Sequence, residues 1–209
     1  PDVVDNSGAQ AIPAATLVNN GQLTELDDTF MNAPSIDDPN VTLAESVIDG
    51  TFDQMTFDGK VYGMSYVVSA WGLWYDANLF AQNDWEPPRT WDELLALGEK
   101  TKAKGIPLLT YQGQHPVYMN ATFLYQGVQK HGGKEVMRRI DNLEDGAWFQ
   151  QPVRDVVEAL YELKVKGHIM PGTAALDHIQ AQSRWLRHKA ALIPCGGWLW
   201  SEMKSQVPK

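Results

Sequence analysis

Two hydrophobic periods run along this chain of 209 residues, the helical spacing of roughly 3.6 residues and the strand spacing of two. Short apolar runs predict strands at residues 3–4, 106–112 and 189–195, and Asp58-Gly59 between β-branched flanks predicts a hairpin. The helical spacing predicts helices over residues 9–19, 42–50, 76–84, 90–104, 115–130, 134–141, 152–166 and 175–188. Because strands alternate with helices, we expect an α/β architecture with a largely parallel sheet.

Capping patterns sharpen two of these helix starts. Thr42 with Glu45, and Thr90 with Glu93, have the spacing of capping boxes, in which the two side chains bond each other's backbone N–H groups. Helices dominate between residues 115 and 188, which is too much helix for one simple strand–helix–strand repeat. We therefore expect a helical lobe built around a small sheet.

The charge balance excludes several classes of partner and cofactor. The net charge is −9 and no basic run occurs, whereas each contact with a nucleic-acid phosphate needs a local cation. Cys195 is the single cysteine, so an internal disulfide and a multi-cysteine metal site are excluded. We therefore expect no nucleic-acid partner, no metal and no cofactor.

Tryptophan is unusually frequent and clustered. The eight tryptophans include the close pairs Trp71/Trp74, Trp85/Trp91 and Trp198/Trp200. Most tryptophans in proteins belong to the core or its boundary, so about half of these need no function. The remainder are candidates for an aromatic binding surface.

Five motifs occur in a fixed order between residues 57 and 200 and carry a family resemblance. They are DGKVYGMSY, GLWYDANLF, PPRTWDELLALGEKTKAKGIPLL, RDVVEALYELKVKGHI and WLRHKAALIPCGGWLW. Together they resemble the family 1 extracellular solute-binding proteins of bacterial sugar ABC importers, and they are similar to the N-acetylglucosamine/chitobiose-binding branch of that family. Departures from the family pattern at Ser65, His188 and residues 76–78 leave the ligand open.

The resemblance implies a type II periplasmic-binding-protein fold, an α/β fold of two lobes joined by a hinge. It assigns a truncated lobe one to residues 1–68, a hinge crossing to 69–74 and a helix-rich, nearly complete lobe two to 75–194. Residues 195–209 would form the return crossing and the start of a lobe-one helix. Because the family's members are longer, we expect the chain to be a fragment.

The same resemblance implies a function. The protein would be a monomer, periplasmic or extracellular, that captures a neutral mono- or oligosaccharide between its lobes and delivers it to the membrane permease of an ABC importer. The full-length protein would be anchored to the membrane by a segment that this fragment lacks. No catalysis is expected.

Sugar recognition needs flat rings over the C–H faces of a pyranose and planar polar groups for its hydroxyls. Trp198 matches the tryptophan of the family's G-x-W motif, which commonly stacks on sugar; its alternative role is core packing at a helix start. Trp71 and Trp74 lie three residues apart, so on a strand they would face opposite sides. We expect Trp71, beside Ser69, to face the ligand and Trp74 to face the core.

Polar candidates lie where predicted strands end, which is where open α/β sheets place ligand contacts. In the second lobe they are Tyr111, Gln112, Gln114 and His115, and in the first lobe Asn6 and Ser7. The alternative interpretation is a polar loop whose hydrogen bonds are satisfied locally.

A hydrolase is the competing function class. The chain lacks G-x-S-x-G, H-E-x-x-H, P-loop and G-x-G-x-x-G motifs. Glycoside hydrolysis needs two facing carboxylates, and the acid pairs available are Asp27-Asp28, Asp37-Asp38 and Asp92-Glu93. These pairs lie in loops or helix caps, and Cys195 lacks the spacing of a papain-like nucleophile, so we expect a buried, inert thiol.

Overall fold

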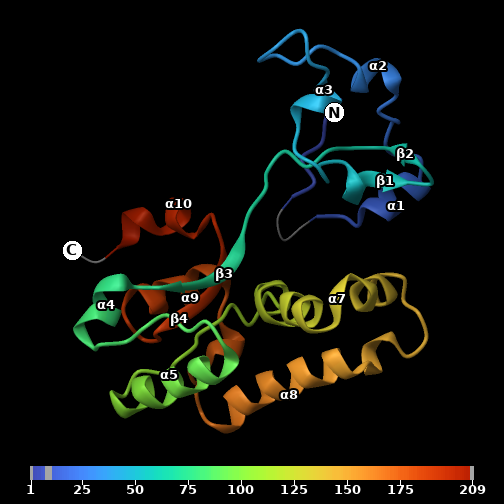
Figure 1. Ribbon diagram of the computed structural model, residues 1–209. Helices are drawn as coiled ribbons and strands as arrows, with labels where there is room; N and C mark the ends of the chain where they lie inside the picture. Colours follow the sequence, from blue (N-terminus) through green and yellow to red (C-terminus); the bar gives the residue numbers. More distant parts are fainter. Residues whose placement is uncertain (1, 8–10, 208–209) are drawn as a thin grey trace. The chain divides into compact units, whose positions relative to one another are not determined.

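A computed structural model describes residues 2–7 and 11–207. It divides into two compact units, Pro1–Val68 and Ser69–Lys209, which we call unit 1 and unit 2. Each unit is described by itself (Figure 1).

Unit 1 consists of short elements joined by loops. They are α1 (Ala14–Asn19), α2 (Asp28–Met31), α3 (Leu43–Ser46), η1 (Asp53–Met55), β1 (Thr56–Phe57) and β2 (Lys60–Val61). The capping box of α3 is present, because Thr42 Oγ1 accepts from Glu45 N and Glu45 Oε2 accepts from Thr42 N. The predicted helix start at Thr42 is therefore confirmed, although the helix ends at Ser46 rather than near Gly50.

The predicted hairpin is also confirmed. β1 and β2 pair antiparallel, with Thr56 opposite Val61 and Phe57 opposite Lys60. Asp58 and Gly59 between them have φ values of 50° and 77°. Two consecutive left-handed residues define the turn that matches the twist of the flanking strands, which explains why the Asp-Gly pair signals it.

Two predictions in unit 1 are wrong. Residues 3–4 form no strand, and the side chains of Val3 and Val4 are 87% and 57% exposed. The first helix begins at Ala14 with Pro13 as its N-cap, so residues 11–13 are not helical, and the start expected near residue 9 lies outside the described residues. Apolar residues predict a strand only where a neighbouring strand pairs with them, and the described residues of unit 1 provide no partner there.

Unit 2 contains the longer elements. They are β3 (Trp71–Tyr75), α4 (Ala77–Gln82), α5 (Trp91–Ala103), α6 (Val117–Met119), η2 (Asn120–Tyr125), α7 (Gln126–Asp141), η3 (Ala147–Phe149), α8 (Gln151–Val165), η4 (Thr173–Ala175), α9 (His178–Leu186), β4 (Leu192–Gly196), α10 (Leu199–Met203) and η5 (Lys204–Gln206). α7 and α8 contact each other along their lengths (Figure 1). The helix-rich architecture expected for this part of the chain is confirmed.

The sheet differs from the prediction. β3 and β4 pair antiparallel, from Trp71 opposite Gly196 to Tyr75 opposite Leu192. Parallel pairing among the described residues is confined to Leu109, which bridges Ile169 and Leu192. The predicted strand at residues 106–112 is shorter than expected. Backbone hydrogen bonds join residues 107–110 to residues 191–192 on one side and to residues 168–170 on the other.

Helix starts differ from the prediction in two places, whereas a predicted helix stop is confirmed. Gly133 has a non-helical backbone with φ 78° and ψ −178°, so it separates two helical stretches within α7, as the predicted stop at Gly132-Gly133 requires. α9 begins at His178, because Asp177 forms a capping box with Gln180. Only half of the predicted capping box of α5 is present, since the Glu93 carboxylate accepts from Arg89 N at 2.6 Å rather than from Thr90 N.

The core of unit 2 surrounds β4, whose five residues are all buried. Leu192 packs into one apolar cluster with Phe80, Leu97 and Leu163. Ile193 and its neighbour two residues on, Cys195, pack into a second cluster with Leu199 and Met203. Alternate residues of one strand therefore anchor two clusters, which fixes the end of β4 against the rest of unit 2.

Candidate functional site

Three aromatic rings meet where β3 begins and β4 ends. The ring centroids of Trp71 and Trp198 lie 4.8 Å apart at an interplanar angle of 88°. The ring of Tyr118 lies 5.5 Å from Trp71 and 6.2 Å from Trp198. Edge-to-face contacts of this kind stabilise each ring beyond its burial alone. We call Trp71, Tyr118 and Trp198 the aromatic triad.

The backbone of β4 creates the position of Trp198. Gly196 lies opposite Trp71 in the strand pair, and a Cβ on Gly196 would come 1.9 Å from the six-membered ring of Trp198. The indole therefore lies directly against the glycine backbone, which no other residue type allows. Ser69 lies beside the next residue, with its Oγ 3.6 Å from the Cβ position of Gly197.

The triad is partly open to solvent. Trp71 and Trp198 are half-buried, whereas Tyr118 is 9% exposed. Burial raises the pKa of the Tyr118 phenol to about 12, and the nearby ionisable groups Cys195 and Glu202 add to this shift. The phenol therefore stays protonated at neutral pH and remains a hydrogen-bond donor. Sequence reasoning missed Tyr118, although it lies three residues after the candidate His115.

Trp74 lies three residues after Trp71 on β3. Both indoles pack against the buried cluster that contains Ile193, Cys195 and Leu199. Trp74 Nε1 donates to the carbonyl oxygen of Gly196 at 3.2 Å, so its ring lies along the strand pair. In the strand pair Trp71 lies opposite Gly196 and Trp74 lies opposite Ile193, so the two residues start from opposite faces, as strand alternation predicts.

The segment of residues 111–115 is held close to η4. Thr173 Oγ1 accepts from Tyr111 N at 2.8 Å and donates to Tyr111 O at 2.7 Å. A Cβ on Gly113 would come 2.3 Å from the backbone of Ala174, so the two segments pass in direct backbone contact. This part of the predicted site is therefore a fixed segment and not a mobile loop.

The polar candidates of this segment have different surroundings. Tyr111 and His115 are half-buried, and the His115 ring lies 5.4 Å from that of His178. Gln114 is exposed, and its amide donates to Ala175 O at 2.8 Å. Gln112 is fully buried and donates to Pro194 O at 2.9 Å. Its side chain thus links the segment to β4 rather than reaching the surface, contrary to its predicted exposure to ligand.

The unit 1 candidates lie in a locally bonded loop. The Asn6 amide donates to Ile12 O at 2.8 Å and accepts from Ile12 N at 2.9 Å, so both its polar groups have partners. Ser7 is exposed. A hydrogen bond with Ser7, and a second with Tyr66, lower the pKa of the Asp5 carboxyl.

The groups that would serve a hydrolase have other roles. Cys195 is fully buried, as predicted, and burial raises the pKa of its thiol to about 11. Asp27 caps α2, and Asp38 accepts from Asn40 N. Across the described residues no group of three or more His, Cys, Asp or Glu side chains has the arrangement of a metal site.

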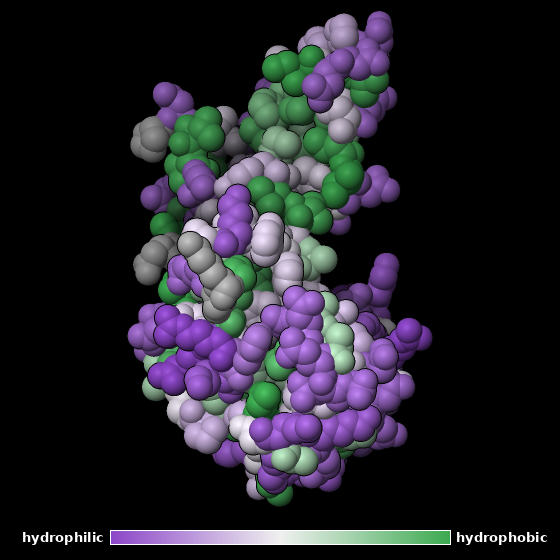
Figure 2. Space-filling view, turned by 90° about the vertical axis from the view of Figure 1, so that its left-hand side faces the viewer, coloured by the Kyte–Doolittle hydropathy of each residue, from purple (hydrophilic) through white to green (hydrophobic). Residues whose placement is uncertain are grey.

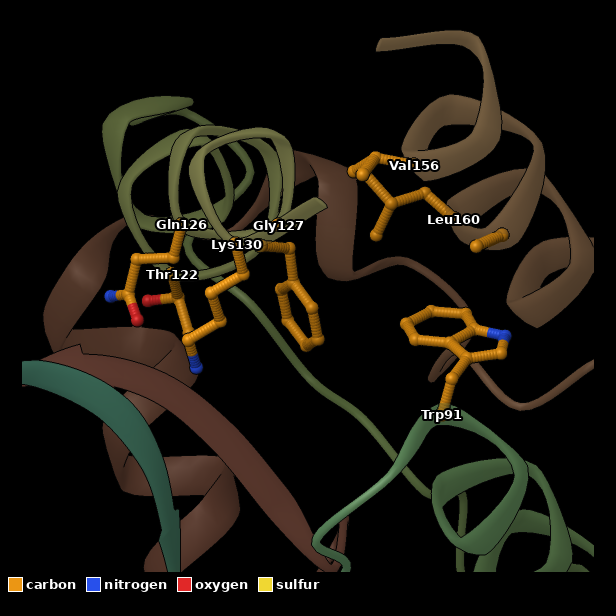
Figure 3. Close-up of a pocket in the computed structure, with 9 residues that line it drawn as sticks. Trp91, Thr122, Gln126, Gly127, Lys130, Val156 and Leu160 are labelled. Atoms are coloured by element: carbon orange, nitrogen blue, oxygen red, sulfur yellow. The ribbon is translucent and has the colours of Figure 1, made fainter. Parts of the chain in front are cut away.

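A cavity lies between α5, η2, α7 and α8 (Figure 3). Its volume is about 170 Å³, and its walls are Trp91, Thr122, Phe123, Gln126, Gly127, Lys130, Val156, Ala159 and Leu160. Figure 3 shows Trp91 below Val156 and Leu160, with Thr122, Gln126 and Lys130 on the opposite side. The lining is chiefly apolar, which suits hydrocarbon better than the hydroxyls of a sugar.

Comparison with known proteins supplies the family. All residues from 1 to 209 match the family described as bacterial extracellular solute-binding protein. The diacetylchitobiose binding protein NgcE of Streptomyces coelicolor is 36% identical over 205 residues, which cover 98% of this chain and 42% of that protein. An uncharacterized ABC transporter extracellular-binding protein of Pyrococcus horikoshii is 27% identical over 163 residues, 77% of this chain and 38% of that protein.

Solved structures share the fold. A chitin oligosaccharide binding protein has a TM-score of 0.72 at 22% identity, covering 93% of this chain and 46% of its own. A structure from work on xylan utilization by Caldanaerobius polysaccharolyticus has a TM-score of 0.75 at 22% identity, covering 89% and 45%. The chain thus spans less than half the length of these proteins.

Within the described residues, no helix combines the length and apolar composition that a bilayer crossing requires. The ordered motifs, the full-length family match and the shared fold agree with one another. The chain belongs to the bacterial extracellular solute-binding protein family.

Proposed function

We propose that this chain is part of the sugar-binding component of an ABC importer, and that the aromatic triad forms the apolar surface on which the sugar lies. The observation that supports this most directly is the pair of half-buried indoles, Trp71 and Trp198, held at 4.8 Å in one place. The C–H face of a pyranose packs well on such a ring, and the remaining polar side chains serve its hydroxyls.

Ser69, Tyr111, Gln114 and His115 are the proposed polar partners in unit 2. Ser69 lies beside Gly197 at the start of the Trp198 turn. His115 precedes Tyr118 by one helical turn, and Tyr118 N donates to His115 O at 3.2 Å. Hydroxyl, amide and imidazole groups near flat rings are the chemistry that a neutral sugar needs.

The ligand class that we propose is a short N-acetylglucosamine oligosaccharide such as diacetylchitobiose. The support is the 36% identity, over nearly the whole chain, to a protein named for that ligand. In the whole protein, lobe one would include residues 1–68 and lobe two residues 75–194, with crossings at 69–74 and 195–209. Asn6 and Ser7 would contribute the lobe-one contacts.

The mechanism follows from that arrangement. Sugar that contacts both lobes binds the closed state more tightly than the open state and shifts the equilibrium towards closure. We propose that the closed protein then delivers the sugar to a membrane permease. The protein would be a periplasmic or extracellular monomer, attached to the membrane by an anchor. No covalent step is required of the protein, which fits the high pKa of the Cys195 thiol.

Calorimetric titration of the full-length protein against mono- and oligosaccharides tests the proposal. Trp198→Ala should weaken binding of the best sugar at least about tenfold, or roughly 1.4 kcal/mol. Trp200→Ala is the matched control, because Trp200 lies two residues away and is 62% exposed. Unchanged affinity in a folded Trp198→Ala variant would show that Trp198 serves core packing and not sugar binding. If every sugar fails to bind while another solute binds, the sugar function is wrong.

A further inference from the structure

A buried amide on α9 contacts the short helix that follows Trp198. Gln182 is fully buried, and its Nε2 donates to Glu202 Oε2 at 2.9 Å. The same nitrogen lies 3.8 Å from Cys195 Sγ. A polar side chain among apolar neighbours is costly unless it is bonded, so its presence here calls for an explanation.

Glu202 is tied to Trp198 by the backbone. Glu202 N donates to Trp198 O at 3.1 Å, which makes Trp198 and Glu202 the two ends of one helical turn. α10 has only five residues, and its N-cap position, Trp198, makes no side-chain capping hydrogen bond. A helix this short is unstable by itself and depends on contacts with the rest of the fold.

We propose that Gln182 is a positioning residue for Trp198. The Gln182 amide holds the Glu202 carboxylate against α9, the carboxylate holds the first turn of α10, and that turn sets the Trp198 ring over Gly196. Leu199 and Met203 bury α10 on its apolar side, but apolar contacts are not directional. A hydrogen bond is directional, so it can select one rotation of the helix.

The neighbours of Glu202 are consistent with a single dominant donor. His178 Nε2 lies 3.7 Å from Glu202 Oε1, longer than a hydrogen bond, and both side chains are partly exposed. Gln182 Oε1 has no hydrogen-bond partner among the described residues. The amide thus makes its strong contact through one end, the end that faces α10.

The functional meaning of this positioning role rests on the proposed sugar function, but the first test of the role needs no sugar. Trp71 and Trp198 are close enough for their transitions to couple, which gives a circular-dichroism couplet. The couplet is the part of the circular-dichroism spectrum that is lost when Trp198→Phe is compared with the unmodified protein. We expect Gln182→Leu and Glu202→Ala to lose most of the couplet while keeping far-ultraviolet helix content and cooperative thermal unfolding.

Glu202→Gln is the conservative control, because its amide oxygen still accepts from Gln182. It should keep the couplet. Glu202 is partly exposed, so its substitution disturbs the fold less. If Gln182→Leu fails to fold, Glu202→Ala tests the positioning role by itself. A folded Gln182→Leu or Glu202→Ala variant with the full couplet would overturn the proposal, as would equal loss in Glu202→Gln.

The second measurement is calorimetric binding of diacetylchitobiose. We expect affinity to fall about tenfold in Gln182→Leu and to stay near wild type in Glu202→Gln. If the wild-type protein binds no diacetylchitobiose, the proposed ligand is wrong, while the couplet still tests the positioning role.

Discussion

The two units of this chain are stabilised in different ways. Unit 2 has several clusters of buried apolar side chains, in which Leu163, Ile193 and Cys195 are fully buried. Among residues 2–7 and 11–68 of unit 1, no apolar side chain is buried, and only Ser35 and Thr51 reach that class. Figure 2 shows apolar side chains at the surface of unit 1, whereas hydrophilic side chains cover most of the visible surface of unit 2.

Many hydrogen bonds of unit 1 are local. The capping box at Thr42, the Asp27 cap and the Asn6–Ile12 pair each join residues close in sequence. Such bonds define a turn but do not tie distant segments together. Candidate residues on a packed scaffold lose less conformational entropy on binding, so the triad is better prepared for ligand than Asn6 and Ser7.

The largest effect should come from the core of unit 2. Leu163→Ala removes a fully buried side chain and should lower the free energy of unfolding by about 3 kcal/mol. All eight tryptophans lie between residues 71 and 200, so tryptophan fluorescence during urea unfolding reports on unit 2 alone.

The paired variant in unit 1 is Ile48→Ala, at a side chain that is 61% exposed. It should change stability by no more than about 0.5 kcal/mol, measured by amide hydrogen exchange of residues 56–61. Similar losses of unfolding free energy in Leu163→Ala and Ile48→Ala would show that unit 1 has a core of its own. The proposed difference between the two units would then be wrong.

A smaller effect than that of Leu163→Ala is expected at Gly196, whose backbone lies against the Trp198 ring. Gly196→Ala forces the indole off the backbone and should cost about 2 kcal/mol of unfolding free energy, as overpacking does. Gly72→Ala is the control, because Gly72 is on the adjacent strand and an added Cβ meets nothing within 4 Å. The two variants are compared by urea unfolding and by near-ultraviolet circular dichroism. Equal effects would mean that the Trp198 ring has another available position.

Local signals in the sequence predicted local structure well. The Asp58-Gly59 turn and the capping box of Thr42 depend on residues within a few positions of one another, and both are present. The strand at residues 3–4 and the largely parallel sheet depend on partners elsewhere in the fold. The strand is wrong, and parallel pairing is limited to the bridges of Leu109 with Ile169 and Leu192. Sequence periodicity describes one segment and carries no information on what pairs with it.

The candidate site shows the same division. Trp71 and Trp198 were predicted from motifs, and the structure brings their rings together. Tyr118 joins them through α6, which contacts β4, and the buried Gln112 amide bonds to the carbonyl of Pro194. The apolar cavity beside Trp91 needs α5, η2, α7 and α8 to come together, which no single segment encodes.

An effect smaller than that of Gly196→Ala should come from the capping box of unit 1. Thr42→Ala removes the acceptor for Glu45 N and should destabilise α3 by about 1 kcal/mol, seen as faster amide exchange at residues 43–46. Hydrogen bonds with the backbone and side chain of Thr42 lower the pKa of the Glu45 carboxyl from 4.5. A carboxyl with a lowered pKa stabilises the fold above its unfolded pKa and loses that contribution as the pH falls.

Exchange at residues 43–46 should therefore quicken below about pH 4.5, after correction for intrinsic rates, and this pH dependence should weaken in Thr42→Ala. Tryptophan fluorescence should not change in either case, because the capping box serves unit 1 and every tryptophan lies in unit 2. A shift in the fluorescence midpoint would show that the units unfold together, and the contrast between a core-stabilised unit and a locally bonded one would then describe one cooperative structure.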